Sequence, residues 1–404
     1  MLNSIILKDF FSFKGENKID LNKGANLLLG INGSGKTSFI NALRLLYEGI
    51  SGSGIENLIQ SQWGGFYQIV NCTGREKTNE IQITYVFDFD EVNTFGNSKK
   101  FTSPVFYQLT IHPIGNTDYF LDEKLWVEES RDANKPVVYL DFHNGQGRLR
   151  KFSRVEDFEI VNYTNGDISG HELVIKQISD PNQNLPIQSI KKTIEALVVY
   201  NSFDTSESSR LRRVAEYSTG TRLWKNGENL TQILNHLKNN HSLDFEQIEE
   251  TLQKVNPSYK EIVISNITGQ AYLSLREKNL DRVIGALHIS DGTLHFLLLE
   301  AIFLNPNRGA LIGLDEPERG LHPDMIRSVA EMIKLASKDT QFIIATHSPH
   351  LLNQFELDDV LVFEKNENNS TVVKKLSETD FSDYEGDLLP GQLWLNGELG
   401  GKRW

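Results

Sequence analysis

The sequence predicts an α/β protein whose parallel sheet is split by a long insertion. Short apolar runs alternate with helical patterns near both ends of the 404-residue chain, which is typical of a parallel sheet covered by helices. A glycine-rich loop joins a buried run to a helix at residues 30–37. Between the two ends, residues 91–280 change first to alternating runs and then to helices. One α/β domain interrupted by inserted segments explains this order.

The first 90 residues contain short strands and one helix. In the helix that follows residue 35, Phe39, Leu43 and Leu46 share a face at helical spacing. Alternating or continuous apolar runs predict the strands. The predicted strands are residues 3–10, 16–21, 25–30 and 79–90.

The middle of the chain changes character twice. Residues 91–185 favour antiparallel strands, because short alternating runs are separated by Asn, Gly and Asp. The following segment is mainly helical, with residues 187–200 predicted as one helix, before two further strands. Helix and strand alternate again after residue 281. The predicted units are 1–90, a β-rich lobe at 91–185, a helical and mixed region at 186–280, and 281–404 with the C-terminal tail.

Composition and charge limit the functional classes. The net charge of −13 disfavours a whole surface that binds nucleic acid, because phosphate contacts depend on Lys and Arg. The densest basic cluster, Arg210, Arg212 and Arg213, is interpreted as a solvated helix face. The single cysteine, Cys72, suits a reducing compartment. We expect a cytoplasmic protein without a signal peptide or membrane-spanning segment.

The loop at residues 30–37, GINGSGKT, fits the pattern G-x-x-x-x-G-K-[ST]. Its glycines let backbone N–H groups turn toward phosphates, and the helix that follows adds positive charge at its N-terminus. Lys36 is predicted to reach the β- and γ-phosphates, and the Thr37 hydroxyl to ligate Mg²⁺. The predicted nucleotide-binding residues of this loop are Gly30, Asn32, Gly33, Ser34, Gly35, Lys36, Thr37 and Ser38.

A carboxylate pair follows a second apolar run. Residues 310–314 predict a strand that ends in Asp315 and Glu316. Taken alone, this pair before a proline is equally typical of an ordinary turn. Beside a phosphate-binding loop, Asp315 is predicted to hold Mg²⁺, usually through water. Glu316 is then placed to orient or deprotonate an attacking water molecule.

A histidine follows a third buried run at residues 341–346. The run delivers His347 to the carboxyl edge of the sheet, where α/β proteins bind ligands. A histidine at a strand end is more often structural, but here it is predicted to contact the γ-phosphate and the attacking water. The histidines near these motifs show no metal-ligand spacing, so no metal site is predicted among them.

The segment LHISDGTLHFLLLEAIF, residues 287–303, has two interpretations. Ser290 could cap an ordinary buried helix, since the residues that follow are apolar almost all round. The same hydroxyl and the backbone at Gly292 could instead bind a phosphate at the helix N-terminus. The position just before the strand of Asp315 favours the second interpretation.

Four motifs therefore stand in the order GINGSGKT, ISDGT, GLDEPERGLHP and ATHSP. In this order and wording the chain resembles the ABC-type ATPases, and more closely their SMC-like and OLD-like (overcoming lysogenisation defect) branch. The insertion and the tail resemble stand-alone ATPase subunits of bacterial phage-defence and abortive-infection systems. This resemblance implies a split ABC-type P-loop ATPase head with a mixed sheet, interrupted by an inserted β-rich and helical lobe.

The resemblance also implies roles for individual residues. Ser290, Asp291 and Gly292 would form the signature motif that contacts the γ-phosphate held by a second protomer, and residues 319–322 would lie at the dimer seam. The implied catalytic residues are Glu316, His347 and Lys36, and the implied metal-binding residues are Thr37 and Asp315. Gln60 and Gln62 are the candidates for the Q-loop residue.

Two departures from related families matter. Asp291 stands where transporter signatures have glycine, a form that OLD-like relatives share. Full-length OLD proteins add a Toprim nuclease domain, whereas this sequence ends soon after ATHSPHLL without a carboxylate-rich α/β segment. The insertion also lacks the heptads of a long SMC coiled coil.

The leading hypothesis is a homodimeric clamp that binds ATP and Mg²⁺, hydrolyses ATP, and controls a separately encoded effector, a nuclease or toxin, in anti-phage defence. A second hypothesis is a DNA-binding repair clamp resembling RecF, which would use the basic cluster at residues 210–213. Contact with DNA, directly or through the partner, stays open. A third hypothesis is a scaffold or sensor with slow turnover.

Overall fold

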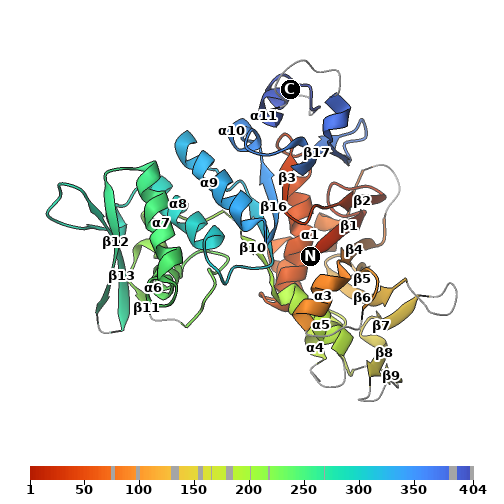
Figure 1. Ribbon diagram of the computed structural model, residues 1–404. Coiled ribbons are helices and arrows are strands. Elements are labelled where there is room, and N and C mark those ends of the chain that lie inside the picture. The colour runs from red at the N-terminus through yellow and green to blue at the C-terminus, as the bar shows by residue number, and fades with distance from the viewer. Residues whose placement is uncertain are drawn as a thin grey trace.

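The computed structural model describes most of the chain. The described residues are 1–73, 78–96, 101–128, 136–152, 158–164, 166–178, 185–200, 202–216, 219–267, 269–381 and 389–400. The last four residues of the predicted tail lie outside this set. Within it, no helix is long and apolar enough to cross a membrane. The described strands form three sheets, which Figure 1 shows together with their helices.

The central sheet joins the two ends of the chain. Its strand order is β10 (Leu197–Tyr200), β15 (Leu311–Asp315), β16 (Gln341–Thr346), β3 (Ala25–Leu29), β17 (Val360–Lys365) and β18 (Thr371–Lys375). Neighbouring strands are parallel, except that β18 runs antiparallel to β17. Every residue of β3 and β16 is buried, as expected for parallel strands covered on both faces. The split sheet predicted from the sequence is therefore present.

Helices cover both faces of the central sheet. Successive residues of β3 alternate between two cores, because Leu28 packs with α1 (Lys36–Ile50) and Leu27 packs with α8 (Asp291–Phe303) and α9 (Pro323–Ala336). Helix α8 is buried almost all round, as its sequence predicted. Because β3 and β15 both run parallel to β16, they end at the same edge of the sheet, where α1 follows β3 and α9 follows β15.

The second sheet is antiparallel throughout. Its order is β2 (Glu16–Asp20), β1 (Leu2–Lys8), β4 (Ile81–Phe87), β5 (Val105–Ile114), β6 (Asp118–Val127), β7 (Val137–His143), β8 (Gln146–Phe152) and β9 (Phe158–Tyr163). Strand β4 pairs with both β1 and β5. The sheet therefore continues without a break across residue 90, where the sequence placed the start of a separate lobe.

One predicted helix was wrong in part. Residues 187–200 form helix α5 (Leu185–Glu195) followed by strand β10, which pairs in parallel with β15. The strand residues Leu197–Tyr200 are all buried, and an apolar run this short has no periodicity that distinguishes strand from helix. A segment assigned to the insertion thus supplies a strand of the central sheet.

A third, smaller sheet packs with helices at the other end of the molecule from the antiparallel sheet (Figure 1). It contains β11 (Ala215–Glu216), β13 (Gln270–Glu277), β12 (Tyr259–Ile267) and β14 (Ile284–Gly285). Helices α6 (Leu230–Asn240) and α7 (Ser242–Val255) pack between this region and α8. The remaining helices are a π-helix (Asn57–Gln62), α2 (Phe66–Ile69), α3 (Phe89–Gly96), α4 (Val174–Gln177), α10 (Pro349–Leu352), α11 (Pro390–Leu395), and the 3-10 turns Arg210–Arg212, Ala286–His288, Leu357–Asp359 and Glu378–Phe381.

Candidate functional site

The glycine-rich loop lies between β3 and α1, at the carboxyl edge of the central sheet. Gly33 and Gly35 have positive φ angles of 80° and 113°, a region that residues with a side chain rarely adopt. A Cβ atom at Gly35 would also collide with the hydroxyl of Thr371. The loop therefore needs glycine for both its backbone conformation and its close packing, and it presents the N-terminus of α1 to the site.

Lys36 folds back over this loop. Its Nζ donates to the carbonyl oxygens of Gly30, at 2.7 Å, and Ile31, at 3.2 Å. Burial lowers the pKa of Lys36, while the charges of Asp315 and Glu316 act in the opposite direction. The ammonium is therefore held in a partly desolvated position, where its attraction for an anion such as a phosphate is stronger than in water.

Thr37 and Asp315 meet across the edge of the sheet. The Thr37 Oγ1 donates to Asp315 Oδ2 at 3.2 Å, although the two residues lie far apart in the sequence. Burial raises the pKa of Asp315, and the hydrogen bond from Thr37 partly offsets it. A hydroxyl and a carboxylate oxygen are hard ligands of the type that Mg²⁺ prefers, and a bound cation would stabilise the charged form of Asp315. These two residues therefore fit the predicted metal.

Glu316 and His347 form the next pair along the same edge. His347 Nδ1 lies 3.1 Å from Glu316 Oε1, and the Glu316 backbone N–H donates to the Ala345 carbonyl at 2.9 Å. Glu316 has a φ of 51°, a strained conformation for a non-glycine residue of the kind that clusters at functional sites. The end of β15 is thereby fastened to the end of β16, and the carboxylate is directed toward the histidine.

The sequence did not single out Glu318 and Thr346. The Thr346 Oγ1 donates to Glu318 Oε1 at 2.5 Å and accepts from the Ser348 N–H at 3.0 Å. Burial raises the pKa of Glu318, and its hydrogen bond holds the segment after Glu316 against the base of the His347 loop. Both residues stand inside the motifs, but their pairing depends on two strands being neighbours, which no local pattern records.

The start of α8 confirms that Ser290 caps a buried helix, which was the first of the two interpretations of this segment. The Ser290 Oγ accepts from the Thr293 N–H at 3.3 Å and lies 2.8 Å from the Thr293 hydroxyl. The Ser290 and Asp291 residues are exposed. A Cβ atom at Gly292 would lie 3.1 Å from the Gly320 carbonyl oxygen, so the helix start and the segment after Glu316 are in close contact. The predicted contact with a second protomer's phosphate stays a prediction.

The interpretation of the basic cluster as a solvated helix face is wrong for Arg212, although Arg210 and Arg213 are exposed. The Arg212 side chain is 4% exposed and pairs with Asp291. It also donates to the carbonyl oxygens of Ile289 at 2.6 Å, Ala286 at 2.9 Å and Thr205 at 3.0 Å. The prediction was wrong at this position because Ala286, Ile289 and Asp291 lie on a segment distant in sequence. Arg212 thus fixes the backbone that leads into Ser290.

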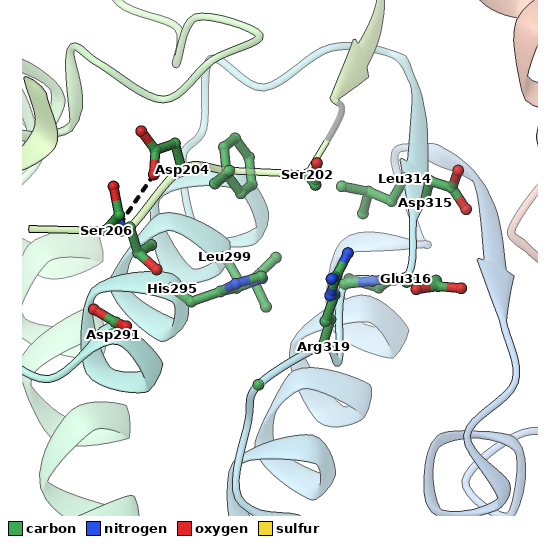
Figure 2. Close-up of a pocket in the computed structure, with 14 residues that line it drawn as sticks. Ser202, Asp204, Ser206, Asp291, His295, Leu299, Leu314, Asp315, Glu316 and Arg319 are labelled. Carbon is green, nitrogen blue, oxygen red and sulfur yellow. Dashed lines mark hydrogen bonds between the residues drawn. The ribbon is translucent and has the colours of Figure 1, made fainter. Parts of the chain in front are cut away.

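A cavity of about 450 Å³ connects the start of α8 with the end of β15. In the view of Figure 2, the side chains of His295 and Arg319 lie between those of Asp291 and Glu316. Burial lowers the pKa of His295 to about 4, so its imidazole is neutral at pH 7. The loop at residues 202–206 forms another wall of this cavity, which the sequence did not indicate.

The two glutamine candidates are directed elsewhere. Gln60 Nε2 donates to Asp118 Oδ1 at 2.9 Å, and Gln62 Oε1 accepts from Arg44. Both glutamines belong to the π-helix Asn57–Gln62. In the described part of the chain, their hydrogen bonds do not reach the glycine-rich loop or Asp315, so the structure does not bring either one into the site.

The chain is similar to a family of AAA domains in sequence and to Smc heads in structure. Residues 166–353 match the model of a family described as "AAA domain, putative AbiEii toxin, Type IV TA system". The chain is similar to an Smc head bound to the C-terminal winged-helix domain of ScpA, with a TM-score of 0.56 and 15% identity over 94% of this chain and 99% of that one. An Smc head with an extended coiled coil from Pyrococcus furiosus, bound to the C-terminal domain of ScpA, gives a TM-score of 0.55 and 13% identity over 95% and 98%.

The fold is therefore that of an SMC-head ABC-type ATPase, which confirms the predicted fold class. Together with the family match, it supports an ABC- or SMC-like ATPase. An uncharacterized protein of Methanocaldococcus jannaschii is 35% identical over 69 residues, which is 17% of this chain and 18% of that protein. The OLD-like branch and a role in phage defence stay predictions.

Proposed function

We propose that this protein binds and hydrolyses ATP with Mg²⁺ as a homodimer that encloses the nucleotide between two copies. The observation that carries the proposal is the arrangement at one sheet edge, where Thr37 meets Asp315 at 3.2 Å and Glu316 meets His347 at 3.1 Å. A phosphate loop and a metal-binding pair, with a carboxylate placed to orient water, are groups that recur in enzymes that hydrolyse nucleotide phosphates.

Each residue has a chemical role in this proposal. The loop N–H groups and Lys36 would hold the β- and γ-phosphates, and Thr37 and Asp315 would hold Mg²⁺, which supplies charge stabilisation to the phosphates when bound. Glu316 would orient the attacking water and accept its proton. His347 would contact the γ-phosphate while its contact with Glu316 keeps that carboxylate in place.

The dimer in this proposal rests on the start of α8. Ser290 and Asp291 are exposed at a helix N-terminus, which suits a phosphate brought by another molecule. The contact between Gly292 and Gly320 links this surface to the segment after Glu316. Closure of the dimer would therefore act on the position of the Glu316 carboxylate in the same chain.

We further propose that the ATPase cycle controls an effector in anti-phage defence. The support is the family description, which names a putative AbiEii toxin and a type IV toxin–antitoxin system. The two Smc heads similar to this chain are bound to domains of another protein, ScpA, so a head of this fold can carry a partner. Isolation of the tagged protein from its host during phage challenge tests this, and an effector that co-purifies only with ATP is the expected result.

A DNA-binding clamp is the second candidate, because the fold is that of Smc heads. The basic cluster supports it less than the sequence suggested, since Arg212 is buried and Arg210 Nη1 lies 3.6 Å from Glu228 Oε2. A DNA affinity that requires ATP, falls steeply with salt and is lost in Arg213→Glu would favour this candidate.

The substitution Glu316→Gln tests the enzymatic proposal. We expect phosphate release to fall by about 100-fold or more, because general-base catalysis contributes at least that factor. The variant should retain ATP and accumulate as a dimer in light-scattering measurements. The matched control is Glu331→Gln, an exposed glutamate on α9. Turnover equal to the wild type in Glu316→Gln would contradict the mechanism, and negligible turnover in the wild type with all partners present would favour the scaffold hypothesis.

A further inference from the structure

We propose that His112, Asp122 and His143 form a Zn²⁺ site on the outer face of the antiparallel sheet. These residues lie on three adjacent strands, β5, β6 and β7. Their nearest ligand atoms all lie within 4.8 Å of one another. The three belong to a sheet that the proposed ATPase mechanism does not use.

The strand register brings the three side chains together. Asp122 stands directly opposite His143, and His112 stands opposite Phe120, two residues before Asp122. Because side chains two residues apart on a strand share a face, all four point to the same side of the sheet. Along β6, buried and half-buried residues alternate, and Asp122 is on the half-buried side, which gives solvent access to the cluster.

The contacts within the cluster favour a shared cation. Asp122 Oδ2 lies 2.9 Å from His112 Nε2, and Asp122 Oδ1 lies 2.7 Å from His143 Nδ1. Among the described residues, the buried Oδ1 atom has no donor in hydrogen-bonding geometry, despite the short distance to His143. A carboxylate oxygen without an aligned donor is costly to bury, and a cation between the three groups would remove that cost.

Phe120 orients the two imidazoles. Its ring stacks on His112 with centroids 4.7 Å apart, and it meets the ring of His143 edge-on at 5.2 Å. The aromatic ring limits the rotation of both histidines and leaves their nitrogens directed at Asp122. Ligands that are already oriented lose less conformational entropy when they bind a metal.

The donor set selects the metal. Two imidazole nitrogens and one carboxylate oxygen are ligands of zinc sites that keep a fourth position for water, whereas Mg²⁺ and Ca²⁺ prefer oxygen ligands. The side chains are 21%, 27% and 71% exposed for His112, Asp122 and His143, so Zn²⁺ can enter from solvent. Bound there, it would cross-link β5, β6 and β7.

Zinc titration of the full chain tests the proposal. Protein stripped with EDTA and dialysed is titrated with ZnCl₂ by calorimetry without nucleotide, and its metal content is measured by atomic spectroscopy. We expect one Zn²⁺ per chain and a rise in the melting temperature on zinc addition. Asp122→Asn and His112→Gln should each weaken binding by about 100-fold, since loss of even an outer-shell partner can cost 10–100-fold.

Two control variants separate this site from other metal-binding groups. His171→Gln removes a second imidazole–carboxylate pair, in which His171 Nε2 lies 3.4 Å from Asp118 Oδ1 at the start of β6, and it should leave zinc affinity unchanged. Asp315→Asn disables the proposed Mg²⁺ pair and should also bind Zn²⁺ normally, which keeps this test independent of the ATPase. Circular dichroism checks that each variant folds. Zinc binding that is absent in the wild type, or unchanged in both folded ligand variants, would overturn the proposal.

Discussion

Arg212 shows how one buried side chain can position a surface loop. Its guanidinium donates to the backbone carbonyls of five residues and to the carboxylate of Asp291, and the planar fork of arginine suits this many acceptors at once. The loop that it holds ends at Ser290, the proposed contact for a second protomer's phosphate. Arg212 would not contact the nucleotide in this proposal, but it would hold the loop that presents Ser290 to the second protomer.

We predict that Arg212→Ala lowers the free energy of unfolding by about 3 kcal/mol, because several buried carbonyl oxygens lose their donor. ATP affinity at the phosphate loop should be nearly unchanged, while turnover falls. Urea unfolding, nucleotide binding and phosphate release measure the three effects. Arg213→Ala, which removes an exposed neighbour, should leave all three at the wild-type level. Full turnover in Arg212→Ala would show that the loop does not need this anchor.

At the scale of elements, Glu123 joins strand β6 to helix α4. Its carboxylate accepts from the backbone N–H groups of Val174, at 2.5 Å, and Ile175, at 3.1 Å, and from the Tyr107 hydroxyl at 2.8 Å. Burial raises the pKa of Glu123 to about 7, although these hydrogen bonds act to lower it. The carboxyl therefore titrates near neutral pH inside the protein.

This pKa predicts that stability falls as pH rises. The ordinary pKa is 4.5, so between that value and about 7 the folded protein holds a proton that the unfolded chain has released. Over this window Glu123 should lower the free energy of unfolding by about 3 kcal/mol, with no further loss above pH 7. Glu123→Gln should remove this part of the pH dependence in urea unfolding at pH 5 and pH 7.5. Glu128→Gln, at an exposed position just after β6, should retain it.

At the scale of the whole molecule, the proposed active unit is two copies of the chain. We predict that Ser290→Arg leaves ATP binding at residues 30–37 nearly intact and abolishes ATP-dependent dimerisation and turnover, because a long cation would occupy the place of the second protomer's phosphate. Light scattering with and without ATP and a phosphate-release assay measure the outcome. Ser242→Arg, at an exposed serine that begins α7, is the matched control. If the Ser290→Arg protein still dimerises with ATP, the proposed contact of Ser290 with the second protomer's phosphate is wrong.

Part of the site could be predicted because its signals are local. The eight residues of the glycine-rich loop are contiguous, and the turn they form has few alternatives once a buried strand precedes it and a helix follows. Ser290 was recognised as a helix cap from its immediate neighbours, and the structure confirms that cap. The central sheet could be inferred from strand and helix alternation at both ends of the chain.

Other parts could not be predicted, because they depend on which strands become neighbours. Residues 197–200 are too short a run to show periodicity, and only their pairing with β15 makes them a strand. Arg212 has two of its partners, Ala286 and Ile289, on a segment more than seventy residues away. The cluster of His112, Asp122 and His143 has no metal-ligand spacing in the sequence, and only the register of three strands brings it together.

The sequence by itself determined the chemistry of this protein at each short segment: a phosphate loop, a carboxylate pair, a histidine at a strand end and a capped helix. The tertiary structure decided which of these segments meet. Thr37 contacts Asp315, and Glu316 contacts His347, only because β3, β16 and β15 lie side by side in that order. Local patterns record backbone conformation and burial, whereas the contacts that build a site come from the pairing of distant strands, which the free energy of the whole fold selects.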